Sequence, residues 1–190
     1  KDVSQIAVVV PTRANGTGCY KLNQLIQDIV LPTRRGEGIE LGTKNQPFTI
    51  YKGDKVINLV NNYEVKPNIF NGNMGEVVEV DKENNKIVVG FYNIGLVEVK
   101  GKNLDNLDLG YAITCHKAQG STMPYLIYCL DYSHFVMLNR QQAYTGITRA
   151  KKQAVLIIET KAFNRAVRTN HVVHKRTFLY HFLVGELPIS

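Results

Sequence analysis

Continuous apolar runs, each followed by a stretch with helical spacing, constrain the fold of this sequence most strongly. The first run, 6–10, predicts a buried strand. The stretch after it has an amphipathic helical pattern that Pro32 ends. Four apolar side chains carry that pattern: Leu22, Leu25, Ile26 and Ile29.

The same alternation returns near the other end of the chain. Runs at 125–130 and 153–159 predict two further buried strands, and helical patterns cover 138–152 and begin again at 161–168. Buried strands that alternate with helices predict an α/β layered domain with a mostly parallel sheet.

The middle of the chain has a different pattern. Short β-branched runs are separated by turn signals at Asn71-Gly72, at 83–85 and at 93–95, as in a small all-β barrel of SH3-like size. We therefore expect the barrel, residues 47–105, to be inserted into an α/β domain made of 1–46 and 106–190. The polar segment 33–47 is expected to be a linker or mobile loop.

Composition favours an anionic partner. The chain of 190 residues has a net charge of +7, which suits nucleic acid first and an anionic membrane surface second, although a merely basic domain is an alternative. Its three cysteines are far apart and form no CxxC pair, so we expect neither a disulfide framework nor a zinc site, and a cytoplasmic location. No apolar stretch approaches the roughly 20 residues of a membrane span. The absence of an initial Met predicts a piece of a longer protein.

The loop after the first strand has some features of a phosphate cradle. Gly16, Gly18 and Lys21 lie between strand and helix, but Cys19 and Leu22 stand where a Walker A motif needs Lys and Ser or Thr. Two interpretations stay open. The loop is a flexible strand-to-helix turn, or Arg13 reaches a phosphate from the carboxyl edge of the sheet, where α/β proteins bind ligands.

Two later stretches also carry chemistry. "YAITCHKAQGSTMP" (111–124) brings His116 and Lys117 together with neutral donors, a set that suits phosphate oxygens. "AYTGITRAKK" (143–152) places Arg149 where it can neutralise a γ-phosphate from the ligand edge of the sheet. Alone, each of these residues is as well explained as a structural histidine or a surface charge. His134 is isolated from the other histidines, and the i, i+3 pair His171 and His174 lacks nearby acids, so we expect no metal site.

Together these stretches resemble motifs V and VI of superfamily 1 DNA helicases of the RecD/TraA type, which include the exodeoxyribonuclease V alpha subunit. "GDKVINLVNNYEV…IFNGNMGEVVEV" is similar to the SH3-like barrel inserted in the second RecA-like domain of that family. "PTRANGTGCYKLNQLIQDIVLP" resembles the segment around motif IV.

The resemblance implies roles for individual residues. Arg149 matches the catalytic arginine finger of motif VI, and Arg13 would join it at ATP. The remaining ATP-binding residues would be Gln119, Gly120 and Thr122. The DNA-binding residues would be Thr114, His116, Lys117, Asn62, Phe70 and Asn71.

The resemblance also implies partners. ATP and Mg²⁺ would be bound by the full-length parent, because Walker A and B motifs are absent from the chain and belong to a missing N-terminal RecA-like domain. The parent would move on single-stranded DNA, 5′ to 3′, alone or with nuclease-complex subunits and without a membrane. The fragment alone is expected to have no ATPase activity.

A passive module that binds single-stranded nucleic acid is the alternative. Its stacking residues would be Tyr63, Phe70, Phe91 and Tyr92, unless these aromatic side chains form the barrel core.

Overall fold

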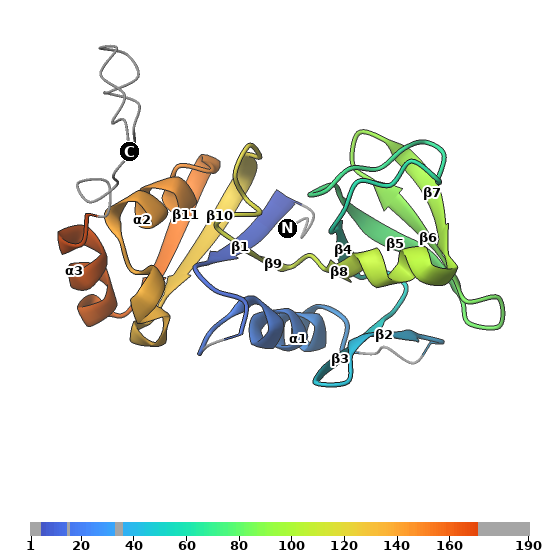
Figure 1. Ribbon diagram of the computed structural model, residues 1–190, viewed down its shortest axis with the longest axis horizontal. Coiled ribbons are helices and arrows are strands. Elements are labelled where there is room, and N and C mark those ends of the chain that lie inside the picture. Colours follow the sequence, from blue (N-terminus) through green and yellow to red (C-terminus); the bar gives the residue numbers. More distant parts are fainter. Residues whose placement is uncertain (1–4, 15, 33–35, 171–190) are drawn as a thin grey trace, which may run out of the picture.

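The chain folds into two joined parts, an α/β layered part and a β-rich part (Figure 1). The computed structural model describes residues 5–14, 16–32 and 36–170. Within these ranges no helix is both long and apolar enough to cross a membrane.

The α/β part is built on a four-stranded parallel sheet with the order β11-β10-β1-β9. Its strands are β1 (Ile6–Val10), β9 (Ala112–Thr114), β10 (Met123–Leu130) and β11 (Ala150–Ile158). Its helices are α1 (Cys19–Val30), α2 (Arg140–Ile147), α3 (Thr160–Arg168) and the 3-10 segment η3 (Tyr132–Met137). The predicted RecA-like parallel sheet is confirmed.

Helices cover both faces of this sheet because its strand residues alternate between them. Val8 and Val10 pack in one cluster with Cys19 of α1. Ala7 and Val9 belong to a second cluster with buried alanines of α2 and α3.

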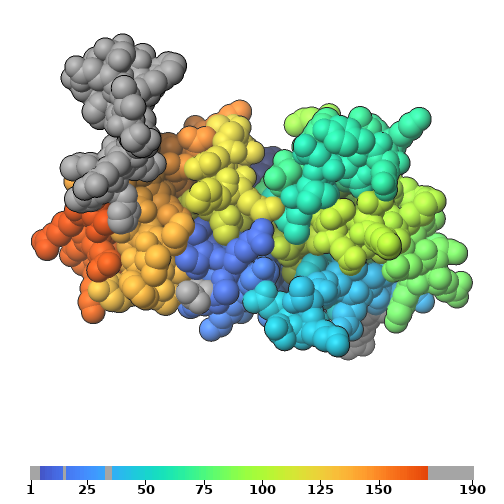
Figure 2. Space-filling model, viewed as in Figure 1, coloured from blue at the N-terminus to red at the C-terminus, as the bar shows by residue number. Residues whose placement is uncertain are grey.

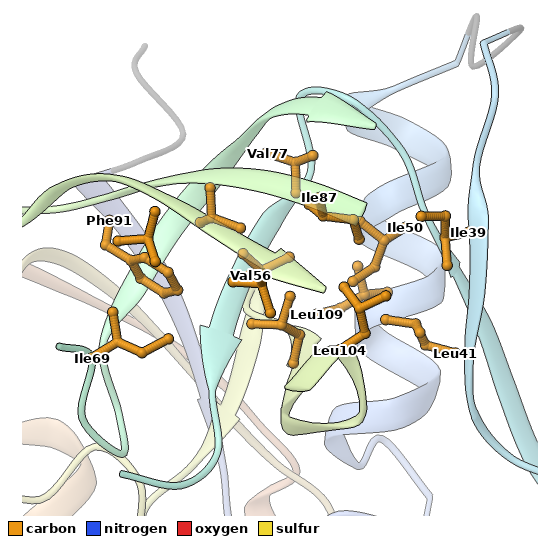
Figure 3. Packing of buried hydrophobic residues seen from close by; sticks show 14 of the residues in the cluster. Ile39, Leu41, Ile50, Val56, Ile69, Val77, Ile87, Phe91, Leu104 and Leu109 are labelled. Atoms are coloured by element: carbon orange, nitrogen blue, oxygen red, sulfur yellow. The ribbon is translucent and has the colours of Figure 1, made fainter. Parts of the chain in front are cut away.

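The β-rich part is a five-stranded antiparallel sheet with the order β7-β6-β5-β4-β8, which curls around one core (Figure 3). Its strands are β4 (Lys55–Asn58), β5 (Met74–Asp81), β6 (Lys86–Phe91), β7 (Gly95–Lys100) and β8 (Leu107–Leu109), with the 3-10 segment η2 (Gly101–Asn106) before β8. The predicted turns are confirmed: Asn85 and Asn93 adopt positive φ between successive strands. This is the small SH3-like barrel expected from the sequence.

The segment 33–47 was expected to be a linker, and for residues 39–47 this is wrong. The antiparallel hairpin of β2 (Ile39–Thr43) and β3 (Gln46–Ile50) occupies this region. Ile39 and Leu41 alternate with polar residues and pack into the barrel core, so the hairpin is anchored. Figure 2 shows it against both α1 and the barrel.

Two further expectations need correction. The helical pattern over 138–152 ends at Ile147, and β11 already begins at Ala150. Among residues 5–14, 16–32 and 36–170, the strand expected to be buried is an edge strand paired with β10, and Val155, Leu156 and Ile157 are exposed.

Buried polar side chains join the two parts. Asp54 is fully buried and accepts hydrogen bonds from Gln27 Nε2 at 2.6 Å and from the Tyr111 hydroxyl at 2.9 Å. Lys55 Nζ donates to the Ile6 carbonyl at 2.7 Å. The boundaries at 47 and 105 stay a prediction. The barrel sheet itself extends to β8, which pairs with β4.

Candidate nucleotide and DNA sites

The loop after β1 is a closed turn rather than a phosphate cradle. The first N–H groups of α1 are used internally: Cys19 donates to the Thr12 carbonyl at 3.2 Å and Tyr20 to the Arg13 carbonyl at 3.1 Å. A Cβ on Gly18 would lie 2.5 Å from the Arg13 carbonyl oxygen, so glycine is required by this close approach. These two N–H groups are therefore not available to bind a phosphate.

Asp131, which follows β10, fixes the same loop. Its carboxylate accepts hydrogen bonds from the Thr17 N–H at 3.1 Å, from the Thr17 hydroxyl, and from the Ser133 N–H at 2.7 Å. Partial burial raises the pKa of Asp131, but hydrogen bonds from Ser133 and Thr17 outweigh burial and lower that pKa to about 2.

The segment from Thr114 to Thr122 crosses from one end of the sheet to the other. Thr114 ends β9, where its buried hydroxyl accepts from the Lys117 N–H at 3.3 Å and its carbonyl from the Ala118 N–H at 3.0 Å. Thr122 lies immediately before β10, at the amino ends of the strands. The exposed residues of this segment are His116, Gln119, Gly120, Ser121 and Thr122, whereas Lys117 is half-buried.

Arg149 meets the end of this segment. Its carbonyl accepts from the Met123 N–H at 2.9 Å, so Arg149 and Thr122 lie side by side before the two neighbouring strands β10 and β11. The guanidinium is held by its Nε donating to the Thr145 carbonyl at 3.1 Å and by an Nη contact to the Thr148 hydroxyl at 3.4 Å. Gly146 lets α2 approach the sheet, since a Cβ there would lie 2.5 Å from the Tyr128 ring.

Arg13 lies at the opposite edge of the sheet. It follows the carboxyl end of β1, whereas Arg149 precedes the amino end of β11, and both strands run parallel to β10 (Figure 1). The expectation that Arg13 and Arg149 share one nucleotide site is wrong, because a residue between a helix and the following strand lies at that strand's amino end. Arg149 therefore lies away from the carboxyl edge of the sheet.

Arg13 instead shares a small cavity with Thr114 and Lys117. Burial lowers the pKa of Lys117, and the positive charge of Arg13 lowers it further. Burial raises the pKa of Asp108, against the opposing effect of Arg13 and Lys117. The carboxyl edge of β1 and β9 thus gathers two cations and one acid.

The barrel presents an aromatic pair. Tyr63 and Phe70, with 64% and 46% of their surface exposed, meet edge to face with ring centroids 6.0 Å apart. Phe91, by contrast, is buried in the barrel core. Of the four aromatic candidates, two are therefore available for stacking on bases, one is core, and Tyr92 is half-buried.

Asn62 and Asn71 shape the same loop. Asn71 is exposed and its N–H donates to the Asn61 side chain at 3.0 Å. Asn62 is buried, pairs through its backbone with Ile69, and accepts from the Glu64 N–H at 2.9 Å. The expected direct contact of Asn62 with DNA is therefore contradicted by its burial.

The remaining cysteine and histidine residues either have structural roles or lie outside the described part of the chain. Cys19, Cys115 and Cys129 are buried free thiols. His134 is buried in a capping box with Asp131. His171 and His174 lie outside the described residues, and within those residues no three His, Cys, Asp or Glu side chains gather as metal ligands would.

Sequence reasoning missed Tyr20 and Asp108. Both line cavities beside α1 and β8. The signal for Asp108 is an acid set between two buried leucines in "LDL".

Two family models match the chain. Residues 22–91 match the ATP-dependent RecD-like DNA helicase SH3 domain, and residues 109–157 match the UvrD-like helicase C-terminal domain. Fold, barrel and motif-bearing loops thus define a superfamily 1 helicase domain.

Curated relatives narrow the class. The ATP-dependent RecD2 DNA helicase of Deinococcus radiodurans is 36% identical over 146 residues, which are 77% of this chain and 19% of that protein. The RecBCD enzyme subunit RecD of Buchnera aphidicola (Acyrthosiphon pisum) is 32% identical over 118 residues, 61% of this chain and 19% of that protein. This chain belongs to the RecD-like DNA helicases. It spans about a fifth of the length of these two relatives.

Solved structures share the fold. Bacteroides Pif1 helicase in complex with ADP-AlF3 and ssDNA aligns with a TM-score of 0.62 and 15% identity, covering 94% of this chain and 46% of that chain. Pif1 helicase from Candida albicans aligns with a TM-score of 0.55 and 15% identity, covering 96% and 50%.

Proposed function

We propose that this chain is the second RecA-like domain, with its barrel insertion, of an ATP-dependent helicase that moves on single-stranded DNA and unwinds duplex. Its N-terminal RecA-like partner domain would supply the Walker A and B motifs. From the resemblance we further propose 5′ to 3′ movement, a cytoplasmic location, and nuclease-complex subunits as further partners.

The amino edge of the sheet would form one wall of the ATP site. Arg149 has five N–H donors, of which the Thr145 and Thr148 contacts use only part, so donors remain for an oxyanion. Gln119, Gly120 and Thr122 lie exposed on the segment that ends beside it. Bound ATP with Mg²⁺ supplies the phosphoryl chemistry, and Arg149 would neutralise the charge that develops on the γ-phosphate.

The carboxyl edge would hold the DNA backbone. Arg13, His116 and Lys117 present two cations and an imidazole there, and phosphate contacts by such residues dominate affinity for nucleic acids. Thr114 would act by shaping the turn that presents His116 and Lys117. On the barrel, Tyr63, Phe70 and Asn71 would extend this track.

One observation carries the proposal: a single segment, 114–122, joins the two edges. It begins at the DNA-side turn closed by Thr114 and ends at the strand start bonded to Arg149. A change at the nucleotide would move residues 119–122, and the short connection would pass that movement to His116 and Lys117.

The test uses the full-length parent. Arg149→Ala is expected to abolish ATP hydrolysis while leaving the dissociation constant for single-stranded DNA unchanged, and Arg140→Ala, in the helix α2 that precedes Arg149, is the control. The 190-residue chain alone is expected to hydrolyse no ATP. Near-normal hydrolysis in the Arg149→Ala parent, or Mg²⁺-dependent hydrolysis by the chain alone, would contradict the proposal.

A passive single-strand-binding module is the second candidate, and the exposed Tyr63–Phe70 pair favours it. The two functions differ in the parent. A motor couples DNA binding to ATP turnover, whereas a passive module binds DNA with the same affinity whether or not nucleotide is present.

A further inference from the structure

We propose that the cavity between α1, the β2–β3 hairpin and β8 holds one unstacked base of a single DNA strand, with the adjoining phosphate at Arg13 and Lys117. The inference rests on the proposed DNA-binding function and adds to it a base pocket with a preference for bases that carry an amino group.

The cavity has the size and lining that a base needs. Its volume is about 410 Å³, within the range of small-molecule sites. Tyr20 from α1 and Phe48 from the hairpin provide aromatic surface, Thr43 and Gln46 provide polar groups, and Arg13 and Asp108 complete the wall. Aromatic side chains stack on bases of any sequence.

The cavity lies beside the carboxyl edge of the parallel sheet. Arg13 lines both this cavity and the small cavity that reaches Thr114 and Lys117. Tyr20 and Asp108 line both cavities as well, so the wall is continuous. A nucleotide could therefore place its phosphate at the two cations and its base against Tyr20.

Asp108 supplies an acceptor for the base. One carboxylate oxygen accepts from the Leu109 N–H at 2.8 Å, and among the described residues no hydrogen bond or ion pair reaches the other. Burial raises the pKa of this carboxyl group, consistent with a group that water solvates poorly. A free carboxylate oxygen accepts hydrogen bonds from the exocyclic amino groups of cytosine, adenine and guanine, which thymine lacks.

The hairpin makes this pocket. Gly42 adopts φ +94, and Ile39 and Leu41 bury their side chains in the barrel core. Its anchored turn thus presents Thr43, Gln46 and Phe48 to α1 from the barrel side.

The experiment measures binding of the 190-residue chain to the shortest oligodeoxycytidylate that retains full affinity, so that one register dominates. Each nucleotide in turn is replaced by an abasic residue. We expect one position to weaken binding about tenfold, the loss of one stacked base. Tyr20→Leu and the cavity-filling Thr43→Trp are expected to remove that position-specific loss, whereas Tyr144→Leu, an exposed tyrosine outside the cavity, leaves it unchanged.

Thymine at the sensitive position tests Asp108. We expect thymine to bind several-fold more weakly than cytosine, and Asp108→Asn to reduce this difference. The pocket, but not the proposed function, would be overturned by either of two results. In one, abasic replacement weakens DNA binding equally at every position. In the other, the position-specific loss is the same in wild type and in both cavity variants. Absence of any DNA binding would overturn both.

Discussion

Asn23 and Ala112 are joined by two hydrogen bonds: Asn23 Oδ1 accepts from the Ala112 N–H at 2.6 Å, and Nδ2 donates to the Ala112 carbonyl at 3.1 Å. Nδ2 also donates to the Leu109 carbonyl at 3.0 Å. The buried amide thus fixes α1 to the place where the chain leaves the barrel and re-enters the parallel sheet.

Replacing this amide is expected to loosen the junction. Asn23→Ala leaves one N–H and two carbonyls without their partner, and unfolding free energy is expected to fall by about 3 kcal/mol. Chemical denaturation measures this, with the exposed neighbour Gln24→Ala as a control within about 0.5 kcal/mol of wild type. A loss for Asn23→Ala no larger than that of Gln24→Ala would contradict the role of the junction.

Gly146 is expected to tolerate no side chain. A Cβ would lie 2.5 Å from Tyr128 Cε2 and 3.3 Å from Cys115 Sγ, so Gly146→Ala is expected to lower the free energy of unfolding by about 1–3 kcal/mol. Combining it with Tyr128→Leu removes the ring, and the double variant is expected to lose less than the sum of the single losses. Additive losses would show that the contact with Tyr128 is not the cause.

Asp131 is expected to make stability depend on acid pH. Its pKa is about 2 in the folded chain against 3.8 ordinarily, so its contribution, about 2 kcal/mol, is present above about pH 4 and is lost as pH falls toward 2. Denaturation at a series of pH values is therefore expected to show Asp131→Asn less stable than wild type at neutral pH, with the difference shrinking on acidification. The exposed Asp105→Asn serves as the control, and a difference that stays constant with pH would contradict the assignment.

Phe70 is expected to contribute to single-stranded DNA binding by stacking on a base, and not through any charge. Phe70→Ala is expected to weaken binding of single-stranded DNA by about tenfold. Because no cation is lost, the slope of log K against log salt is expected to stay unchanged. Leu96→Ala, another exposed apolar residue of the barrel, is the matched control, and an equal effect of both variants would count against stacking.

The sequence predicted the strands themselves better than it predicted which strand lies at the edge of the parallel sheet. The continuous apolar run 6–10 and the turn signals between the barrel strands report local geometry directly, so β1 and the barrel strands were predictable. The edge position of β11 was not, because burial of Val155 and Ile157 depends on whether another element covers that strand.

The sequence also predicted only part of the arrangement of the candidate site residues, again because their positions depend on contacts between elements. The sequence motifs selected Arg149 and residues 114–122 as site candidates, but which end of the sheet each occupies depends on strand register. For this reason the sequence alone did not show that Arg13 and Arg149 lie at opposite edges of the sheet. Burial of Asn62 and the cavity beside Tyr20 arise from contacts between the barrel, the hairpin and α1, which no local pattern encodes.

The separation of the two edges is tested most directly by the salt dependence of single-stranded DNA binding to the 190-residue chain. Arg13→Ala and Arg149→Ala each remove one positive charge, so they are matched. We predict that Arg13→Ala lowers affinity and reduces the slope of log K against log salt by about 0.7, the loss of one phosphate contact, while Arg149→Ala leaves both unchanged. A slope reduced equally by both variants, or by Arg149→Ala alone, would contradict the account.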